Sequence, residues 1–314
     1  MTMKNLSFYL SICVLIVVTF SSCKEEPPYI NYAPPQSIFD TTYLTGNYTA
    51  TPRQVLIEDV SGAGCSNCPK AATIAHNIIN ANPGRVNEVT IYPNNTSFST
   101  LVLPININGF KSKYDFTTDI AMRIVNYVSV PPSLPSGYID RKNISGNWYE
   151  PKESWTTDVA NELSVASPVN IDIVPTYNST YNTLSVVATL TYTAADSGSN
   201  YIHVMILQDS IIDVQENTDG TGNVFYDPTY VHNNTLMDML TAPTGDLLNT
   251  SPDRNLVPGR VFKIGYQKTL GARTGSHSGY PQPAWDPKHL SILVFVTEGA
   301  TTKYVLQSKS VAVQ

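Results

Sequence analysis

The chain has 314 residues, of which 42% are hydrophobic and 14% are charged, and its formal net charge is −6. Enough apolar residues are present to build a core, so the composition excludes a fully disordered chain, and the length suits about two domains. The acidic balance and the lack of a cluster of lysines and arginines argue against nucleic-acid binding, because a phosphate backbone would be repelled.

The N-terminus predicts a bacterial lipoprotein signal peptide over residues 1–22. Lys4 is the only charged residue there, and the apolar stretch over residues 8–20 is too short to cross a bilayer but suits a signal sequence. The stretch ends in Phe-Ser-Ser-Cys23, and small residues before a cysteine resemble a lipobox. Cys23 would then become the first residue and carry lipid (palmitate). An ordinary secretory signal that is cleaved nearby is the alternative.

Residues 23–50 are expected to form an extended tether between the membrane and the folded part. Lys24-Glu25-Glu26 follows Cys23 directly, and this acidic pair resembles the surface-export signal of Bacteroidetes lipoproteins, although it also suits the solvated start of a tether. We therefore expect a protein of the cell outer membrane that is held by lipid on Cys23, on either the periplasmic or the surface face.

Residues 51–166 combine strand and helix patterns and predict an α/β domain. The expected elements are strands at 55–60, 86–92 and 138–139 and helices at 66–82, 111–128 and 151–165. The proline-rich segment that precedes Tyr138 cannot be helical, because proline removes a backbone donor and clashes with the preceding turn.

Residues 167–314 predict an all-β domain that begins at Ser167-Pro168. The expected strands are 169–174, 184–192, 201–208, 260–270, 290–297 and 303–313. Several short strands without intervening helices favour an antiparallel, immunoglobulin-like sandwich. The insertion over 211–259 is expected to contain one short helix, at 234–240.

Cys65-Ser-Asn-Cys68-Pro69 follows the first predicted strand directly. A strand, a loop, a C-x-x-C pair and a helix in this order are typical of a thioredoxin-like site. If Cys13 leaves with the signal and Cys23 carries lipid, Cys65 and Cys68 are the remaining pair, in an oxidising compartment where a disulfide persists. A helix N-terminus would stabilise a Cys65 thiolate, and Cys68 is close enough to resolve a mixed disulfide. The pair is either catalytic or structural.

A second element of such a site is a cis-proline loop. The Leu134-Pro135 bond is the best candidate, because a predicted strand follows it, and Pro131 and Pro132 are rivals. An ordinary trans bond is the alternative, as for any bond that precedes proline.

A third element is an acid on the strand that precedes the cysteines. Glu58 and Asp59 both lie there, and strand alternation predicts that only one of them faces the interior. A buried Asp59 beneath the disulfide would have a raised pKa and could accept the proton of Cys68. The alternative is that the inward carboxylate forms a cap or an ion pair.

Three segments together resemble one family. Residues 55–69 look like the opening of the Omp-twenty-eight-related outer-membrane lipoproteins of Bacteroidetes, residues 134–141 resemble that family's proline-strand segment, and residues 230–236 resemble its histidine-containing segment. The resemblance covers about residues 50–314. It implies a thioredoxin-like domain followed by an immunoglobulin-like β-domain, and it implies no settled activity.

One departure from this resemblance concerns the residue before the first cysteine. The family usually has an aromatic residue there, whereas this chain has Gly64. The missing ring removes apolar surface near the sulfur and argues against efficient exchange with protein substrates.

No motif predicts a cofactor or a metal. There is no second cysteine pair, and the histidines lack ligand spacing, so a zinc site is not expected. His232, Asp227 and Asn233 either form a polar binding patch or fix the irregular insertion through side-chain-to-backbone bonds. We favour a binding lipoprotein with a structural disulfide, whose partner is an exported protein or an extracellular ligand. The alternative is a thiol-disulfide oxidoreductase.

Overall fold

The computed structural model describes residues 37–94 and 96–313. The expected signal peptide, the expected lipid on Cys23 and the first part of the expected tether lie outside the described residues, so these remain predictions. Within the described ranges, no helix is both long enough and apolar enough to cross a membrane.

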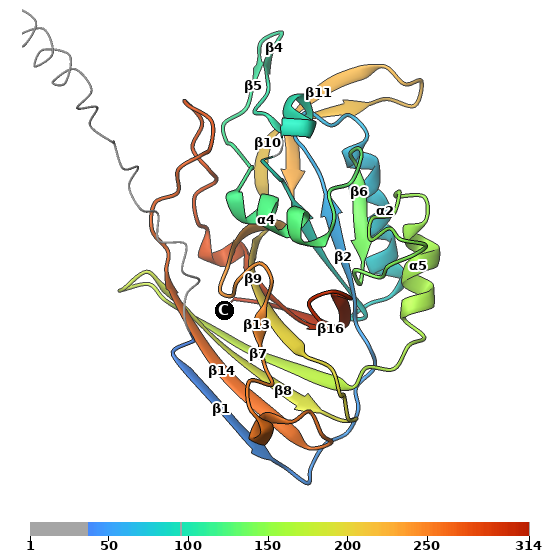
Figure 1. Cartoon of the computed structure of the whole chain (residues 1–314). Helices are drawn as coiled ribbons and strands as arrows, with labels where there is room; N and C mark the ends of the chain where they lie inside the picture. Colours follow the sequence, from blue (N-terminus) through green and yellow to red (C-terminus); the bar gives the residue numbers. More distant parts are fainter. Residues whose placement is uncertain (1–36, 95, 314) are drawn as a thin grey trace, which may run out of the picture. The chain divides into compact units, whose positions relative to one another are not determined.

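The largest sheet has eight strands and joins segments from both sides of the expected boundary at residue 166 (Figure 1). In spatial order the strands are β16 (Tyr304–Ala312), β15 (Leu290–Glu298), β9 (Asn200–Gln208), β12 (Thr235–Met239), β3 (Val86–Ile91), β2 (Val55–Val60) and β6 (Ser136–Ile139), with β13 (Asp246–Leu247) paired to β9. β2 and β3 run parallel, and β12 runs parallel to β3 and antiparallel to β9. The expected division into two domains stays a prediction.

A second, antiparallel sheet has four strands. Their order is β1 (Phe39–Leu44), β14 (Arg260–Thr269), β8 (Thr183–Tyr192) and β7 (Val169–Asn178). Buried and half-buried residues alternate along β8, as its sequence predicts. The buried side chains of this sheet share one hydrophobic core with residues of β9 and β15, so the two sheets pack face to face. The chain as described is β-rich.

Strand β1 lies inside the segment that was expected to be a tether. Residues 39–44 instead pair with β14 over their whole length, and Gly265 lies opposite Phe39. A Cβ atom on Gly265 would clash with the Phe39 ring, so the glycine makes room for this ring. The folded part of the chain therefore begins before residue 50.

Helices cover both faces of β2 (Figure 1). On one face, α2 (Cys68–Ala81) and α5 (Trp155–Glu162) pack against the odd-numbered residues of β2. On the other face, α4 (Asp119–Val128) packs against the even-numbered ones. All six residues of β2 are consequently buried.

Helix α4 is shorter than the expected 111–128. The side chain of Thr118 accepts a hydrogen bond from the backbone N–H of Ala121 at 3.0 Å, which caps the helix and fixes its start. The residues just before this cap have another role, because the backbone N–H groups of Lys113 and Tyr114 both donate to the Asp213 carboxylate.

The insertion after β9 contains strands in place of the expected helix. Residues 234–240 were expected to be helical, but they contain β12, because pairing with both β3 and β9 outweighs the helix propensity of their Leu and Met residues. Ahead of it lies a hairpin of β10 (Ile211–Thr218) and β11 (Val224–His232). The remaining short elements are η1 (Thr96–Phe98), α3 (Ser99–Val102), β4 (Asn106–Ile107), β5 (Phe110–Lys111), η2 (Pro252–Arg254) and η3 (Pro287–His289).

Candidate functional site

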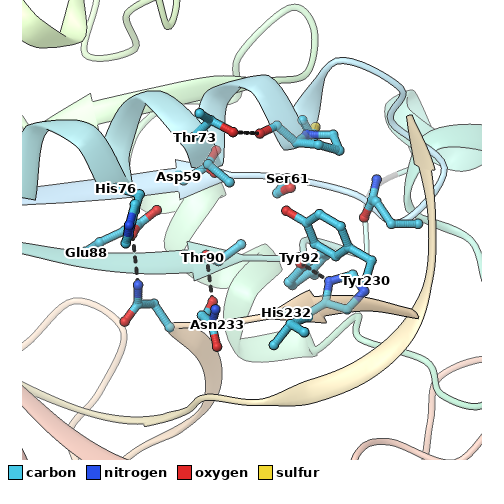
Figure 2. A pocket seen from close by; sticks show the side chains of 16 residues that line it. Asp59, Ser61, Thr73, His76, Glu88, Thr90, Tyr92, Tyr230, His232 and Asn233 are labelled. Atoms are coloured by element: carbon cyan, nitrogen blue, oxygen red, sulfur yellow. Dashed lines mark hydrogen bonds between the residues drawn. The ribbon is translucent and has the colours of Figure 1, made fainter. Parts of the chain in front are cut away.

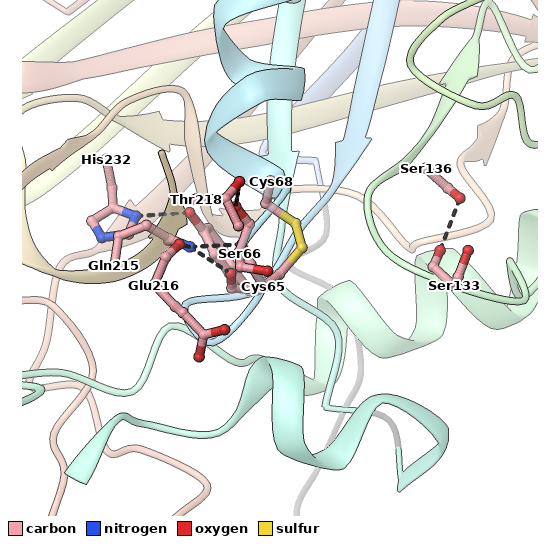
Figure 3. The surroundings of a disulfide bond; sticks show 11 residues. Cys65, Ser66, Cys68, Ser133, Ser136, Gln215, Glu216, Thr218 and His232 are labelled. Atoms are coloured by element: carbon pink, nitrogen blue, oxygen red, sulfur yellow. Dashed lines mark hydrogen bonds between the residues drawn. A yellow bond between two sulfur atoms is a disulfide. The ribbon is translucent and has the colours of Figure 1, made fainter. Parts of the chain in front are cut away.

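Cys65 and Cys68 form a disulfide at the start of α2, as the C-x-x-C motif predicts (Figure 3). Cys68 is the first residue of the helix, and Pro69 occupies the next position, where the missing N–H costs no helical hydrogen bond. Only 2% of each cysteine is exposed. The disulfide is therefore buried, and so are residues 61–65 of the loop that leads into it.

The β10–β11 hairpin covers this loop from one side (Figure 3). The buried Gln215 Nε2 donates to the carbonyl oxygens of Gly62 and Cys65, both at 3.1 Å. The backbone N–H of Glu216 donates to the Ala63 carbonyl at 2.8 Å. These bonds hold the hairpin against the residues that lead into the first cysteine.

The segment at 100–102 covers the loop from another side. The backbone N–H of Gly64 donates to the Leu101 carbonyl at 2.8 Å. A Cβ atom on Gly64 would lie 2.8 Å from the Thr100 carbonyl oxygen, and one on Gly62 would clash with the Leu101 carbonyl. An aromatic residue at position 64 does not fit here, because even a Cβ atom would be too close to this carbonyl oxygen.

The Leu134-Pro135 bond is cis, as predicted, and it is the single cis bond recorded within 37–94 and 96–313. Ser136, the next residue, pairs with Val60 at the end of β2. The register of β6 therefore brings the cis-proline to the end of β2 that leads into the cysteine loop.

Glu58 and Asp59 are both buried, so the expectation that only one of them faces the interior is wrong. Because helices cover both faces of β2, each of the two alternating faces is internal. Glu58 forms a two-pronged ion pair with the buried Arg141, with both N–O distances at 2.7 Å. Asp59 points to the opposite face, toward α2.

Asp59 and Cys68 line one cavity of about 240 Å³, which we call the polar cavity (Figure 2). Its floor is the face of β2 and β3 that carries Asp59, Glu88 and Thr90. One wall is the first half of α2. The other wall is the end of β11, which includes His232, together with the turn that follows this strand. The parallel register pairs Asp59 with Thr90, and this places both side chains on the same face.

Burial controls the charges in the polar cavity. Burial, and then the nearby Glu88, hold the pKa of Asp59 well above its usual value. Burial raises the pKa of Glu88 to about 7, although a hydrogen bond from Asn234 opposes the shift. Burial also lowers the pKa of His232 to about 3, so its ring is neutral at pH 7. Within the described part of the chain, Asp59 Oδ1 and His232 Nε2 have no hydrogen-bond partner.

The structure separates Asp227 from the other two members of the suggested patch, because His232 and Asn233 both line the polar cavity and Asp227 does not. His232 is buried, and its Nδ1 lies 2.9 Å from Tyr92 Oη in the polar cavity. Asp227 instead accepts hydrogen bonds from the backbone and hydroxyl of Thr229 on the exposed side of β11, so it fixes the local backbone. Asn233 likewise accepts a bond from the Ser210 backbone N–H.

Glu88 is the residue that sequence reasoning missed. Its signal is the alternation over residues 88–92, where Glu88, Thr90 and Tyr92 recur at every second position and apolar residues lie between them. A polar face on an otherwise buried strand indicates a polar cavity. Among the residues described, no group of three or more His, Cys, Asp and Glu side chains is arranged to hold a metal ion.

Comparison with known proteins shows similarity in fold only. No protein-family model matches the chain, and no curated protein matches it. A structural-genomics target from Agrobacterium tumefaciens aligns with a TM-score of 0.46 at 9% identity, over 85% of this chain and 97% of that one. HBP35 of Porphyromonas gingivalis aligns with a TM-score of 0.57 at 14% identity, over 85% of this chain and 77% of that chain, so this chain is similar to HBP35 in fold.

Proposed function

We propose that this chain is a binding protein of the bacterial cell envelope whose Cys65–Cys68 disulfide is structural. The observation that carries the proposal is the burial of both cysteines, at 2% exposure each, in a loop whose backbone is held by hydrogen bonds to the β10–β11 hairpin and to the segment at 100–102. Thiol–disulfide exchange requires an attacking thiolate to reach a sulfur atom along a free path. A buried disulfide in such a loop is suited to a structural role rather than to exchange.

The polar cavity beside the disulfide is the proposed binding surface. It is lined by buried groups that lack partners in the described chain, and one of its walls belongs to the insertion between β9 and β13. The disulfide fixes the start of α2, and this helix forms another wall. The disulfide would therefore support binding, because it holds one wall of the cavity in place.

We assign the chain to the Omp-twenty-eight-related lipoproteins, with a thioredoxin-like unit over 51–166 and an immunoglobulin-like unit over 167–314. Support comes from the parallel β2 and β3 around α2, from the cis-proline at 135 and from the likeness in fold to a protein of Porphyromonas gingivalis, which is a member of the Bacteroidetes. The sequence supports lipid on Cys23 and attachment to the outer membrane. Loss of palmitate labelling in Cys23→Ser would support the anchor, and retained labelling would overturn it.

Accessibility of the disulfide tests the structural role. The mature chain, from residue 23 with Cys23→Ser, is tested for reduction of insulin disulfides and for its own rate of reduction by dithiothreitol. We expect no insulin reduction above background and slow reduction of the Cys65–Cys68 bond. Insulin reduction that disappears in Cys65→Ser would overturn the proposal.

A thiol-disulfide oxidoreductase is the second candidate, favoured because Cys68 and Asp59 line the same cavity. In the reduced protein the Cys65 thiolate would attack a substrate disulfide, forming a mixed disulfide and releasing one substrate thiolate. Cys68, after giving its proton to Asp59, would then attack the Cys65 sulfur and release the second thiolate. A Cys68→Ser variant that traps a mixed disulfide with exported proteins would favour this candidate.

A further inference from the structure

We infer that the polar cavity binds a primary ammonium group, carried by a small amine or by a lysine side chain. The inference rests on the proposed binding function, and it names the chemical class of the ligand. It follows from an unpartnered carboxylate, from the charge of the lining, from the size of the cavity and from a neutral histidine.

The first observation is the unpartnered carboxylate oxygen. Asp59 is 1% exposed and lines the cavity, yet its Oδ1 atom has no hydrogen-bond partner among the described residues. A buried polar atom without a partner is costly, and the cost is greater for a carboxylate. A ligand with N–H donors would remove this cost, and an ammonium group brings three such donors.

The second observation is the charge of the lining. Glu88 lies on the same face of the sheet as Asp59, and the two acids disfavour each other's ionisation. Asn234 Nδ2 donates to Glu88 Oε2 at 2.8 Å and fixes that carboxylate. None of the described residues that line the cavity is Lys or Arg. A bound cation would offset the repulsion between the two acids, whereas an anion would add to it.

The third observation is the size of the cavity, about 240 Å³. Pockets for drug-sized ligands are larger, roughly 300–1,000 Å³. The polar cavity therefore accepts only a small molecule or one side chain of a larger partner. Tyr92 and Tyr230 also line it, and aromatic faces attract organic cations.

The fourth observation concerns His232, which is 1% exposed and whose Nε2 atom has no partner in the part of the chain described. Its Nδ1 atom lies 2.9 Å from Tyr92 Oη, and the tautomer decides which of the two donates. In the tautomer that carries its proton on Nδ1, Nδ1 donates to Tyr92 Oη and Nε2 can accept a hydrogen bond. In the other tautomer, Nδ1 accepts from Tyr92 Oη and Nε2 can donate one. His232 can therefore bond a second polar group of the ligand without adding positive charge.

Isothermal titration calorimetry tests the inference on the mature chain (from residue 23, Cys23→Ser) with its disulfide intact. The probes are 1,4-diaminobutane and the peptide acetyl-Gly-Lys-Gly-amide, and 1,4-butanediol is the neutral analogue. We expect saturable binding at pH 8 of at least one of the two amines and none of the diol. Binding of diaminobutane alone points to a free amine, and binding of the peptide points to a lysine side chain.

Two variants locate the site. Asp59→Asn keeps the side-chain volume and removes the charge, and it should weaken amine binding by about tenfold to a hundredfold. Asp172→Asn is the matched control and should bind like the parent chain, because this side chain is 73% exposed and lies on β7, outside the cavity. The melting temperature of each variant is measured in parallel, so that loss of folding is separated from loss of binding.

Failure of the inference is distinct from failure of the proposed function. Absence of amine binding, equal binding of the diol, or unchanged affinity in Asp59→Asn each overturns the ammonium site and leaves the structural disulfide in place. Insulin reduction by the parent chain overturns the proposed function, whatever the calorimetry shows.

Discussion

Gln215 Nε2 donates to the carbonyl oxygen of Cys65 at 3.1 Å, although 150 residues separate the two in the chain. Gln215 is buried, and its amide also donates to the carbonyls of Gly62 and Glu216. One side chain of the hairpin thus contacts two carbonyl groups of the C-x-x-C loop and one of the hairpin itself. We expect the access of reductants to the disulfide to depend on this contact.

Gln215→Ala should therefore expose the disulfide. The substitution leaves three carbonyls without this donor, and we expect a loss of about 1–3 kcal/mol in the free energy of unfolding. Reduction by dithiothreitol, followed by maleimide labelling of Cys65 and Cys68, should become faster by about tenfold, the factor that 1.4 kcal/mol represents in an equilibrium. Gln267→Ala removes an exposed side-chain bond to Ser185 and serves as the control. An unchanged rate in Gln215→Ala would mean that the hairpin does not limit access.

Gly64→Ala should destabilise the protein. The new Cβ atom would lie 2.8 Å from the Thr100 carbonyl oxygen, and a backbone atom cannot move aside as a flexible side chain can. Overpacking of this kind costs about 1–3 kcal/mol. Gly220→Ala is the matched control, because nothing lies within 4 Å of the added atom. Urea unfolding measures both variants, and equal stability would show that α3 can shift away from the loop.

Breaking the buried ion pair should have the largest effect. Glu58→Gln leaves the Arg141 guanidinium buried without a compensating charge, and we expect a loss of about 3–5 kcal/mol in the free energy of unfolding. Glu153→Gln disrupts an exposed pair with Lys152 and should change stability by less than about 0.5 kcal/mol. Chemical denaturation distinguishes the two, and similar small losses would show that water reaches Arg141.

Stability should fall as pH rises from about 4.5 to about 7 because of Glu88. In the folded state Glu88 keeps its proton up to a pKa of about 7, whereas the unfolded chain loses it near the usual value of 4.5. The folded state therefore binds more protons in this window, and stability declines as pH rises. Burial is the main cause of the raised pKa of Glu88, the hydrogen bond from Asn234 opposes it, and the charge of Asp209 adds to it.

Urea unfolding at pH 5 and pH 7 measures this effect. The parent chain should lose more stability between the two values than Glu88→Gln, by on the order of 2–3 kcal/mol. Glu298→Gln, at the end of β15 and outside the polar cavity, is the matched control. Identical pH profiles for the parent chain and Glu88→Gln would show that Glu88 ionises near its usual pKa.

Local sequence patterns predicted the centre of the site. The order of strand, loop, C-x-x-C and helix predicted the position of the Cys65–Cys68 disulfide, and the strand that follows Pro135 predicted its cis bond. These features depend on residues close together in the chain. The alternation of β8 likewise predicted its buried face, because each residue's side of a strand follows from its neighbours.

Contacts between distant segments could not be predicted in this way. Nothing near Gln215 indicates that its amide reaches the cysteine loop, and nothing near Leu236 indicates that β12 lies between two strands. The burial of both Glu58 and Asp59 depends on α4, which lies about sixty residues further along the chain. Contacts with distant segments determine which strands pair and which residues are buried here, and local propensity does not.

The position of β12 between β3 and β9 has a consequence for how the chain can be divided. A fragment that ends at residue 166 would lack β12 and would leave one edge of β3 unpaired. A fragment that begins at residue 167 would lack β3 and would expose the edge of β12 that pairs with β3. Exposed strand edges are templates for pairing with other chains. Each half expressed alone is therefore expected to self-associate, and the two halves should unfold together in one cooperative transition.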